Sequence, residues 1–416
     1  MGALGWVLLF SVPLLVHAAW DSPGPLVVDA SAGAGIQASL AVVAGNPAIS
    51  YLDNTNGTLK YARATDATGT TWVSMTVDDS AVVGAYTSLE VVAGNPAISY
   101  YDSTNGALKY ARATDATGTT WVSMTVDNSV ADVGEHTSLA VVNGNPAMSY
   151  YDGTNGALKF ARATDITGTA WVSTIVDNSA DVGEYTSLAV ISGTPAISYI
   201  DGTNTTLKYA RATDAAGTTW VSMTVDDGSI ILMGTSLAVV GGNPAISYYD
   251  NLNGALKYAR ATDATGTAWT LMTVDDGPSS TALGGSSSLM VVNGNPAIGY
   301  WAYWSFTSNG VKYARATDAT GTAWVSTTVD SGDLYFGQGP SLAVVDNHPA
   351  ISYWGGTFDD GLRYVRSDNP NSVVLRDAAT RPVREGGARL AVGIVTAVAL
   401  GGLAASWKVW CRRITR

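Results

Sequence analysis

The sequence predicts an all-β protein: a seven-bladed β-propeller of four-stranded blades closed by an N-terminal strand, with one C-terminal transmembrane helix in addition. Three observations support this prediction. A unit of about 50 residues recurs seven times, each unit contains four short strand-like segments, and an unmatched strand precedes the first unit. A repeat of this length is typical of propellers and solenoids, and four antiparallel strands per unit describe one propeller blade.

The repeat is easiest to follow in the segment 45–51, which reads Gly-Asn-Pro-Ala-Ile-Ser-Tyr. Its proline, Pro47, returns six more times, at Pro96, Pro146, Pro195, Pro244, Pro296 and Pro349. The spacings are 49, 50, 49, 49, 52 and 53 residues. Such even spacing indicates one supersecondary unit used seven times, in which neighbouring units bury each other's apolar faces.

Each unit contains four predicted strands, which in the second unit span 88–92, 97–101, 107–113 and 121–126. These segments are rich in β-branched and aromatic residues, and turn-forming Gly, Asn, Asp and Pro residues separate them. No stretch within the repeats shows the periodicity of an amphipathic helix. The repeats are therefore expected to consist of strands and turns.

The two ends of the repeat array complement each other. A tryptophan opens the fourth strand in six units, at Trp72, Trp121, Trp171, Trp220, Trp269 and Trp324, but the seventh unit stops near Asp368 without one. Before the first unit, residues 26–29 (Leu-Val-Val-Asp) match the end of a fourth strand, such as 124–127. We expect residues 26–29 to supply the outer strand of blade seven, because an open solenoid would need capping units instead.

The termini differ from the repeats. Residues 1–18 carry an apolar run and a small-residue site, which predict a signal peptide; a buried N-terminal strand is the alternative. Residues 390–407 are uncharged, long enough to cross a bilayer and followed by a basic tail, 408–416; a buried soluble helix is the alternative. We expect a single-pass cell-membrane protein with an extracellular propeller (19–375), a linker (376–389) and a cytoplasmic tail.

Composition limits the partners and cofactors. A net charge of −12 disfavours nucleic acid, whose phosphates an acidic surface repels. One cysteine excludes a disulfide framework and a thiolate metal cluster, and its scarcity in an exported protein favours a bacterial cell surface. The stretch 177–184 alternates oxygen ligands like a calcium loop, but its glycine is one position late and the last ligand is missing. We expect no cofactor, with calcium left open.

The turn between the third and fourth strands resembles a known motif. Residues 66–72 (Asp-Ala-Thr-Gly-Thr-Thr-Trp) are similar to the Asp-box of bacterial sialidase-type (BNR) propellers, with one extra residue between Asp and Gly. The motif recurs at Asp115, Asp165, Asp214, Asp263 and Asp318, and the whole unit resembles bacterial surface propeller repeats over residues 25–368. The resemblance implies a structural role, in which the aspartate caps the turn and the tryptophan packs between blades.

The sialidase resemblance also implies catalytic residues: three arginines for the substrate carboxylate, a tyrosine–glutamate nucleophile pair and an aspartic acid. One arginine per unit occurs in the same register, which indicates a scaffold ladder: Arg63, Arg112, Arg162, Arg211, Arg260, Arg315 and Arg366. The glutamates Glu90, Glu135 and Glu184 show no pairing with a tyrosine outside the repeat pattern. The sequence therefore predicts no enzymatic activity, with a sialidase-like glycoside hydrolase as the alternative.

Aromatic insertions interrupt the repeat in units six and seven, on the face where the loops between the second and third strands open. Five units do without them, so the scaffold does not require them. Adjacent aromatic side chains suit sugar stacking or a protein hot spot, and filling a wider gap is the alternative. The predicted ligand-binding residues are Trp301, Tyr303, Trp304, Phe306, Tyr335, Phe336 and Trp354.

These observations together predict a membrane-anchored, non-catalytic recognition or adhesion module that binds a surface glycan or a protein as a monomer. A purely structural cell-surface protein is the further alternative, which the regular units one to five favour and the aromatic insertions disfavour.

Overall fold

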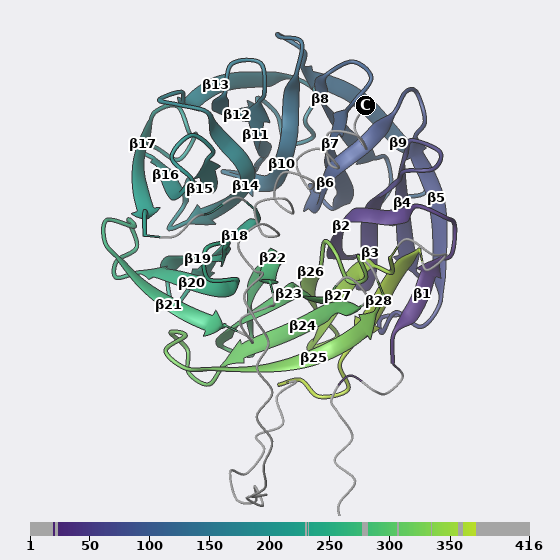
Figure 1. The fold of residues 1–416 in the computed structure, drawn as a ribbon. Coiled ribbons are helices and arrows are strands. Elements are labelled where there is room, and N and C mark those ends of the chain that lie inside the picture. Colours follow the sequence, from purple (N-terminus) through teal and green to yellow (C-terminus); the bar gives the residue numbers. More distant parts are fainter. Residues whose placement is uncertain are drawn as a thin grey trace, which may run out of the picture.

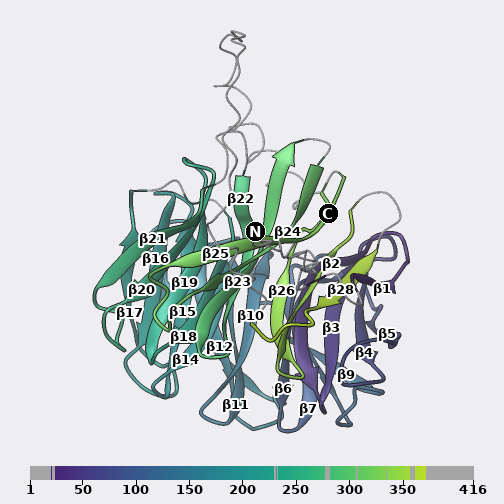
Figure 2. The ribbon, with the colours of Figure 1, turned by 90° about the horizontal axis from the view of Figure 1, so that it is seen from below.

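The computed structural model describes residues 20, 24–228, 231, 233–276, 282–305, 308–333, 335–356 and 361–371. These residues form seven antiparallel sheets of four strands each, arranged in a ring (Figure 1). Seen from the side, the sheets stand next to one another as blades (Figure 2). The predicted all-β propeller of seven four-stranded blades is therefore confirmed.

The two inner strands of each blade follow each other in the chain through a tight turn. The innermost strands, which contact one another around the ring, are β2 (Ala34–Val43), β6 (Val83–Val92), β10 (Val133–Val142), β14 (Val182–Ile191), β18 (Thr235–Val240), β22 (Ala282–Val292) and β26 (Ser341–Val345). The second strands are β3 (Asn46–Asp53), β7 (Asn95–Asp102), β11 (Asn145–Asp152), β15 (Thr194–Asp201), β19 (Asn243–Asp250), β23 (Asn295–Ser305) and β27 (His348–Trp354).

The two outer strands complete each blade. The third strands are β4 (Thr58–Ala64), β8 (Ala107–Ala113), β12 (Ala157–Ala163), β16 (Thr206–Ala212), β20 (Ala255–Ala261), β24 (Ser308–Ala316) and β28 (Leu362–Arg366). The fourth strands are β5 (Trp72–Asp78), β9 (Trp121–Asp127), β13 (Trp171–Asp177), β17 (Trp220–Asp226), β21 (Trp269–Asp275), β25 (Trp324–Gly332) and, from the N-terminus, β1 (Leu26–Asp29).

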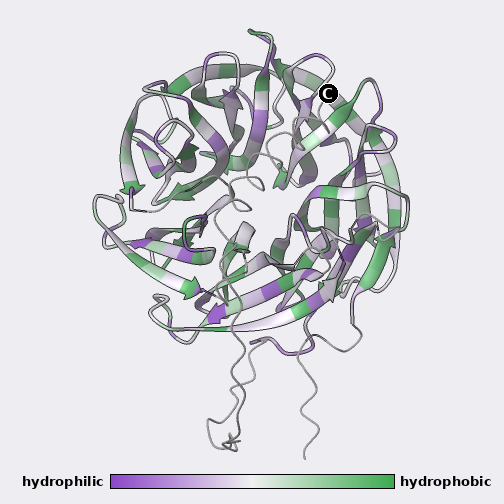
Figure 3. Cartoon of the chain, viewed as in Figure 1, coloured by the Kyte–Doolittle hydropathy of each residue, from purple (hydrophilic) through white to green (hydrophobic). Residues whose placement is uncertain are grey.

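The core consists of apolar clusters between neighbouring blades, and Figure 3 shows apolar segments in the strands of every blade. Between blades one and two, for example, Val43 and Leu59 pack with Ile98 and Tyr100. The second strands are almost entirely buried because both of their faces meet a neighbouring blade. Each blade is therefore stabilised mainly by its two neighbours, which explains why the unit must repeat until the ring closes.

A buried ion pair with a tyrosine recurs between blades. Asp78 accepts hydrogen bonds from Tyr100 Oη (2.6 Å) and from Lys109 Nζ (2.5 Å). Burial alone would raise the pKa of Asp78, but the hydrogen bonds from Lys109, Ser80 and Tyr100 outweigh it and hold this pKa at about 2. Asp127, Asp177 and Asp226 accept the same hydrogen bond from a tyrosine of the next blade, so the last aspartate of the fourth strand has a structural role.

Ring closure by the N-terminal strand is confirmed. β1 pairs antiparallel with β28, with Leu26 opposite Tyr364. Asp29 then accepts a hydrogen bond from Tyr51 Oη at 2.7 Å and pairs with Lys60, so the closing strand carries the same aspartate contact as the other fourth strands.

A seventh interblade tryptophan, which the sequence analysis missed, completes the ring. In six blades the tryptophan packs edge-on against an aromatic ring of the preceding blade, as Trp121 does against Tyr61 at 5.1 Å between ring centroids. Trp20 makes the corresponding contact with Tyr313 at 5.2 Å. It was overlooked because it precedes β1 by six residues instead of opening the strand. Both Trp20 and β1 therefore join the end of the repeat array to its beginning.

The Asp-box-like turns have the structural role that the resemblance implies. Asp66 accepts hydrogen bonds from the backbone N–H groups of Thr68 (3.0 Å) and Thr70 (3.1 Å). Trp72 Nε1 donates to the carbonyl of Gly69 at 2.9 Å. The aspartate thus satisfies the polar groups of the turn while the indole closes it.

The membrane prediction concerns residues beyond this structure. Within the described part of the chain, no helix has the length and apolar character needed to span a membrane. The predicted signal peptide and the predicted span 390–407 both lie outside the described residues.

Candidate active site on the inner rim

The inner rim is the ring of equivalent positions in the bulge at which each innermost strand begins. It comprises Gln37, Tyr86, His136, Tyr185, Gly234, Ser286 and Gly339. The four residues of blades one to four have φ between 53° and 56°, a left-handed conformation that side-chain-bearing residues seldom adopt. Such strain concentrates at functional sites. Large polar or aromatic side chains occupy the rim in blades one to four, and glycine or serine occupies it in blades five to seven.

The side chains of three neighbouring blades stack on this rim. The His136 ring lies between Tyr86 and Tyr185, with centroid distances of 4.3 Å and 4.2 Å. Gln37 Oε1 accepts a hydrogen bond from the Tyr86 backbone N–H at 2.6 Å. All three rings are half-buried, so each keeps part of its surface open to solvent. The stack thus brings two phenol rings and one imidazole together on the inner rim of blades two to four.

Two buried tyrosines and several carboxylates surround the stack. Tyr151 lies 6.4 Å from His136 between ring centroids, and its hydroxyl donates to Asp181 Oδ1 at 2.5 Å. Burial raises the pKa of Tyr151, and the hydrogen bond and negative charge of Asp181, together with the charges of Glu184 and Glu135, raise it further. The Tyr151 phenol therefore remains protonated and acts as a hydrogen-bond donor among three carboxylates.

The same arrangement occurs one blade earlier. Tyr101 lies 6.3 Å from Tyr86, and its hydroxyl donates to Asp132 at 2.6 Å. Burial raises the pKa of Tyr101, and the hydrogen bond to Asp132 adds to the shift, followed by the charges of Asp132 and Glu135. The charge of Glu135 thus contributes to the raised pKa of both Tyr101 and Tyr151.

One glutamate lies beside a tyrosine of the repeat pattern. Glu135 on β10 is the register partner of Tyr151 on β11, the position that Tyr101 and Tyr249 hold in their own blades. The link is hidden in the sequence because the two residues belong to different strands of one blade. The sequence does contain a signal for the stack. Within otherwise uniform units, one position varies in blades one to four: it is Gln37, Tyr86, His136 and Tyr185.

The repeat arginines lie at the opposite ends of the blades, as the scaffold interpretation expects. Arg63 Nε donates to the carbonyl of Val43, at the end of the innermost strand, at 3.1 Å. Arg112 and Arg162 bind the equivalent carbonyls of Val92 and Val142 at the same distance. The ladder arginines are thus separated from the inner rim by the length of a strand.

The aromatic residues predicted to bind a ligand occupy different environments. Tyr303, Trp304 and Tyr335 are half-buried, Phe306 lies outside the described residues, and the remaining three are buried: Trp301, Phe336 and Trp354. Trp301 Nε1 donates to the carbonyl of Phe336 at 3.0 Å. The predicted aromatic residues therefore do not form one surface patch: Trp301 and Phe336 contact each other beside blades six and seven, whereas Trp354 packs with Ile36 and Leu52 of blade one.

Glycines make room for the rings of that region. A Cβ atom at Gly285 would meet the Trp301 ring at 3.1 Å, and one at Gly332 would meet Phe336 at 2.3 Å. Trp354 and Tyr335, however, also reach the apolar cluster that contains Tyr86 and Tyr101. Two of the predicted aromatics therefore adjoin the inner rim from blade seven.

The first aspartate of the calcium-like stretch 177–184 binds protein side chains. The carboxylate of Asp177 accepts hydrogen bonds from Tyr199 Oη and Lys208 Nζ, both at 2.6 Å. The described residues contain no group of three or more histidine, cysteine, aspartate or glutamate side chains arranged to hold a metal ion.

Comparison with known proteins shows the fold. No protein-family model matches the chain, and neither does any curated protein. Among solved structures it is similar to the polysaccharide lyase Uly1, with a TM-score of 0.50 and 13% identity over 79% of this chain and 88% of the lyase. It also matches the Hadza microbial sialidase Hz136, with a TM-score of 0.45 and 15% identity over 80% of this chain and 65% of that one.

The match to the lyase corrects the prediction of a non-catalytic recognition and adhesion module, and with it the prediction that the chain is not an enzyme. That prediction rested on the regularity of the blades, since equivalent arginines in seven units indicated a scaffold only. A propeller of the same fold is a polysaccharide lyase, so a regular scaffold is compatible with catalysis. Regularity excludes an active site only where every blade is alike, and the inner rim is not.

Proposed function

We propose that this protein is a carbohydrate-processing enzyme, a glycoside hydrolase whose active site lies on the inner rim of blades two to four. One observation carries the proposal: the stacked rings of Tyr86, His136 and Tyr185, with their adjoining carboxylates, occur in three blades and break the symmetry of the ring. Clustered titratable groups at a symmetry-breaking position are the expected mark of an active site.

The groups match the needs of glycosidic cleavage. One group must protonate the leaving oxygen while a second activates water or attacks the sugar carbon, and carboxyl groups serve both purposes. Glu135 and Glu184 occupy equivalent places on the neighbouring strands β10 and β14. We assign this pair to the acid and base roles, and His136 to proton exchange beside them. Tyr151 is a positioning residue, because its protonated phenol cannot serve as a nucleophile.

The charge of the site favours a neutral sugar. Asp132, Glu135, Asp181 and Glu184 lie around Tyr101 and Tyr151, the two buried tyrosines beside the stack. The repeat arginines, in contrast, lie at the far ends of the strands. An anionic substrate, such as a sialic or uronic acid, would be repelled. The flat faces of Tyr86 and its neighbours suit stacking against the C–H face of a pyranose ring.

Activity can be measured with the full-length chain on a panel of neutral 4-nitrophenyl glycosides and neutral polysaccharides, following nitrophenol and reducing-end release. We expect at least one substrate to be cleaved, and Glu135→Gln and His136→Ala to lower kcat/KM by about 100-fold or more. His348→Ala is the matched control, because His348 binds Arg366 at the arginine-ladder end of blade seven. Absence of cleavage across the panel, or full activity in Glu135→Gln, would refute the proposal.

We also propose that the propeller works outside a membrane to which it is anchored. The apolar run within 1–18, the uncharged stretch 390–407 and the basic tail support this placement. Protease treatment of intact cells should degrade the propeller while the tail after residue 407 stays protected. Release of the whole chain into the soluble fraction would contradict the anchor.

A further inference from the structure

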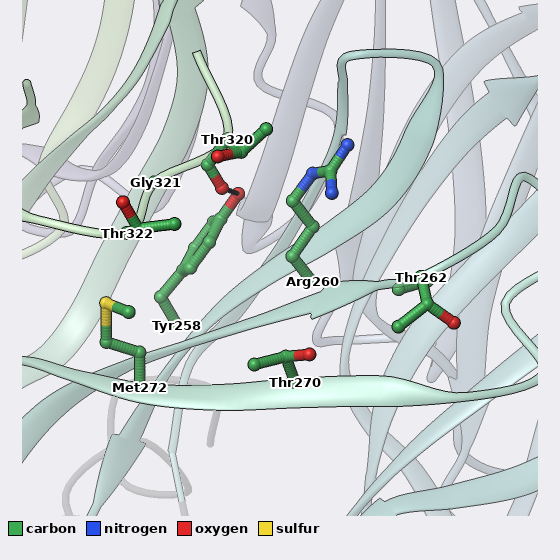
Figure 4. A pocket seen from close by; sticks show the side chains of 9 residues that line it. Tyr258, Arg260, Thr262, Thr270, Met272, Thr320, Gly321 and Thr322 are labelled. Carbon is green, nitrogen blue, oxygen red and sulfur yellow. Dashed lines mark hydrogen bonds between the residues drawn. The ribbon is translucent and has the colours of Figure 1, made fainter. Parts of the chain in front are cut away.

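A pocket of about 200 Å³ lies between blades five and six, beside the arginine ladder and away from the inner rim (Figure 4). Strands β20 and β21 of blade five form one side, and the Asp-box-like turn of blade six forms the other. The lining residues are Tyr258, Arg260, Ala261, Thr262, Thr270, Met272, Thr320, Gly321 and Thr322.

Arg260 binds a carbonyl group of its own blade, as Arg112 does, and does not bridge to blade six. Its Nε and Nη2 atoms both donate to the carbonyl of Val240, at 3.2 Å and 3.1 Å. At the preceding junction, Arg211 Nη1 instead crosses to the carbonyl of Ala264 in the next blade, at 2.7 Å. The Arg260 guanidinium therefore keeps one edge available to a ligand, as its position in Figure 4 illustrates.

One side chain of blade five, Thr270, changes the chemistry of the pocket from that of the repeat. The second residue of the fourth strand is valine in Val73, Val122, Val172, Val221 and Val325, but it is threonine in Thr270. Thr262 and Thr320 add further hydroxyls, and Thr320 Oγ1 donates to Asp318 at 2.6 Å. The Tyr258 ring and the Met272 thioether supply an apolar wall (Figure 4). The pocket thus combines one cation, several hydroxyls and an apolar side.

We infer that this pocket is a second carbohydrate site, which binds one neutral pyranose unit. A guanidinium can donate to two neighbouring sugar hydroxyls, threonines complete the polar contacts, and the tyrosine and methionine cover the C–H face. The carboxylates of Asp263 and Asp318 in the flanking turns disfavour an anion. The site would hold a glycan chain at a distance from the inner rim, and its binding does not require cleavage.

The test measures binding of neutral methyl glycosides to the full-length chain by saturation-transfer NMR and calorimetry. His136→Ala is used as the background, so that binding is scored independently of turnover. We expect Arg260→Met to weaken binding tenfold or more and Thr270→Val, which restores the repeat residue, to weaken it several-fold. Arg112→Met, the equivalent change in blade two, is the matched control and should leave binding unchanged.

Three outcomes overturn the inference: no neutral glycoside binds, Arg260→Met and Thr270→Val both bind as the parent does, or acetate competes while sugars do not. The last result would identify an anion site. Thr270 is exposed, so its variant keeps the test valid if Arg260→Met fails to fold. If the parent chain cleaves no glycoside while the pocket still binds sugars, the proposed function alone is refuted.

Discussion

Replacing Trp20 by alanine tests ring closure most directly, because this side chain joins the N-terminus to blade six. Trp20 is 1% exposed and belongs to the cluster that holds Tyr313 and Val311 of blade six against Leu342 and Tyr353 of blade seven. The change leaves a cavity between blades six and seven, where the N-terminal segment is held.

The cost can be worked out from the contacts. Removing a buried tryptophan side chain costs about 3–5 kcal/mol, and the edge-on contact with Tyr313 at 5.2 Å is of the kind that adds about 0.5–1.5 kcal/mol beyond burial. For a domain of this size, each kcal/mol lowers the melting temperature by roughly 2 °C. Trp20→Ala should therefore melt roughly 7–13 °C below the parent.

Scanning calorimetry measures this shift, and limited proteolysis followed by N-terminal sequencing shows whether β1 detaches first. Trp269→Ala is the control, because Trp269 makes the same edge-on contact, with Tyr209 at 5.1 Å, in the middle of the array. We expect early cleavage near β1 in the Trp20 variant and not in the control. A melting temperature within about 1 °C of the parent would refute the role of Trp20 in closure.

Three further predictions concern the scaffold. The pKa of Asp78 is about 2 in the folded protein, because its hydrogen bonds outweigh burial, and it returns to about 3.9 on unfolding. The free energy of unfolding should therefore be constant above pH 4 and fall towards pH 2. A urea midpoint that does not change between pH 4 and pH 2 would contradict this. Gly134→Ala would place a Cβ atom 2.6 Å from Leu108 Cα at φ 115°. It should therefore lower the urea midpoint more than Gly144→Ala, since a Cβ atom at Gly144 would meet no atom within 4 Å. Equal midpoints for the two variants would count against this reasoning. Deleting 20–30 exposes the edge of β28 and should cause aggregation by light scattering; a monodisperse variant would argue otherwise.

Much of the fold could be predicted because its signals are local and repeated. The alternation of apolar residues, the turn at Asn46 and the Asp-box-like turn at Asp66 each act within a few residues, and seven copies make the pattern unmistakable. Closure by residues 26–29 was predictable for the same reason, since the segment matches a strand already seen. Trp20 was not, because its contact with Tyr313 joins residues nearly three hundred positions apart.

The candidate site was harder to predict, and the two sets of aromatic residues show why. Trp301 and Phe336 stand out in the sequence because they interrupt the repeat, yet they are buried against each other. His136 and Tyr185 hardly stand out, because each is one substitution in a regular unit. Their importance depends on a distance of 4.2 Å that arises only when neighbouring blades meet.

The sequence by itself therefore determined the number of blades, their four strands, the turns and the closing strand, because these depend on periodicity and turn chemistry within one unit. Only the tertiary structure decided which side chains gather on the inner rim and where the arginine ladder leaves a pocket. The physical reason is that a propeller places equivalent residues of successive blades side by side. A small change in one unit then becomes a site through contacts with its neighbours, and no single unit contains that information.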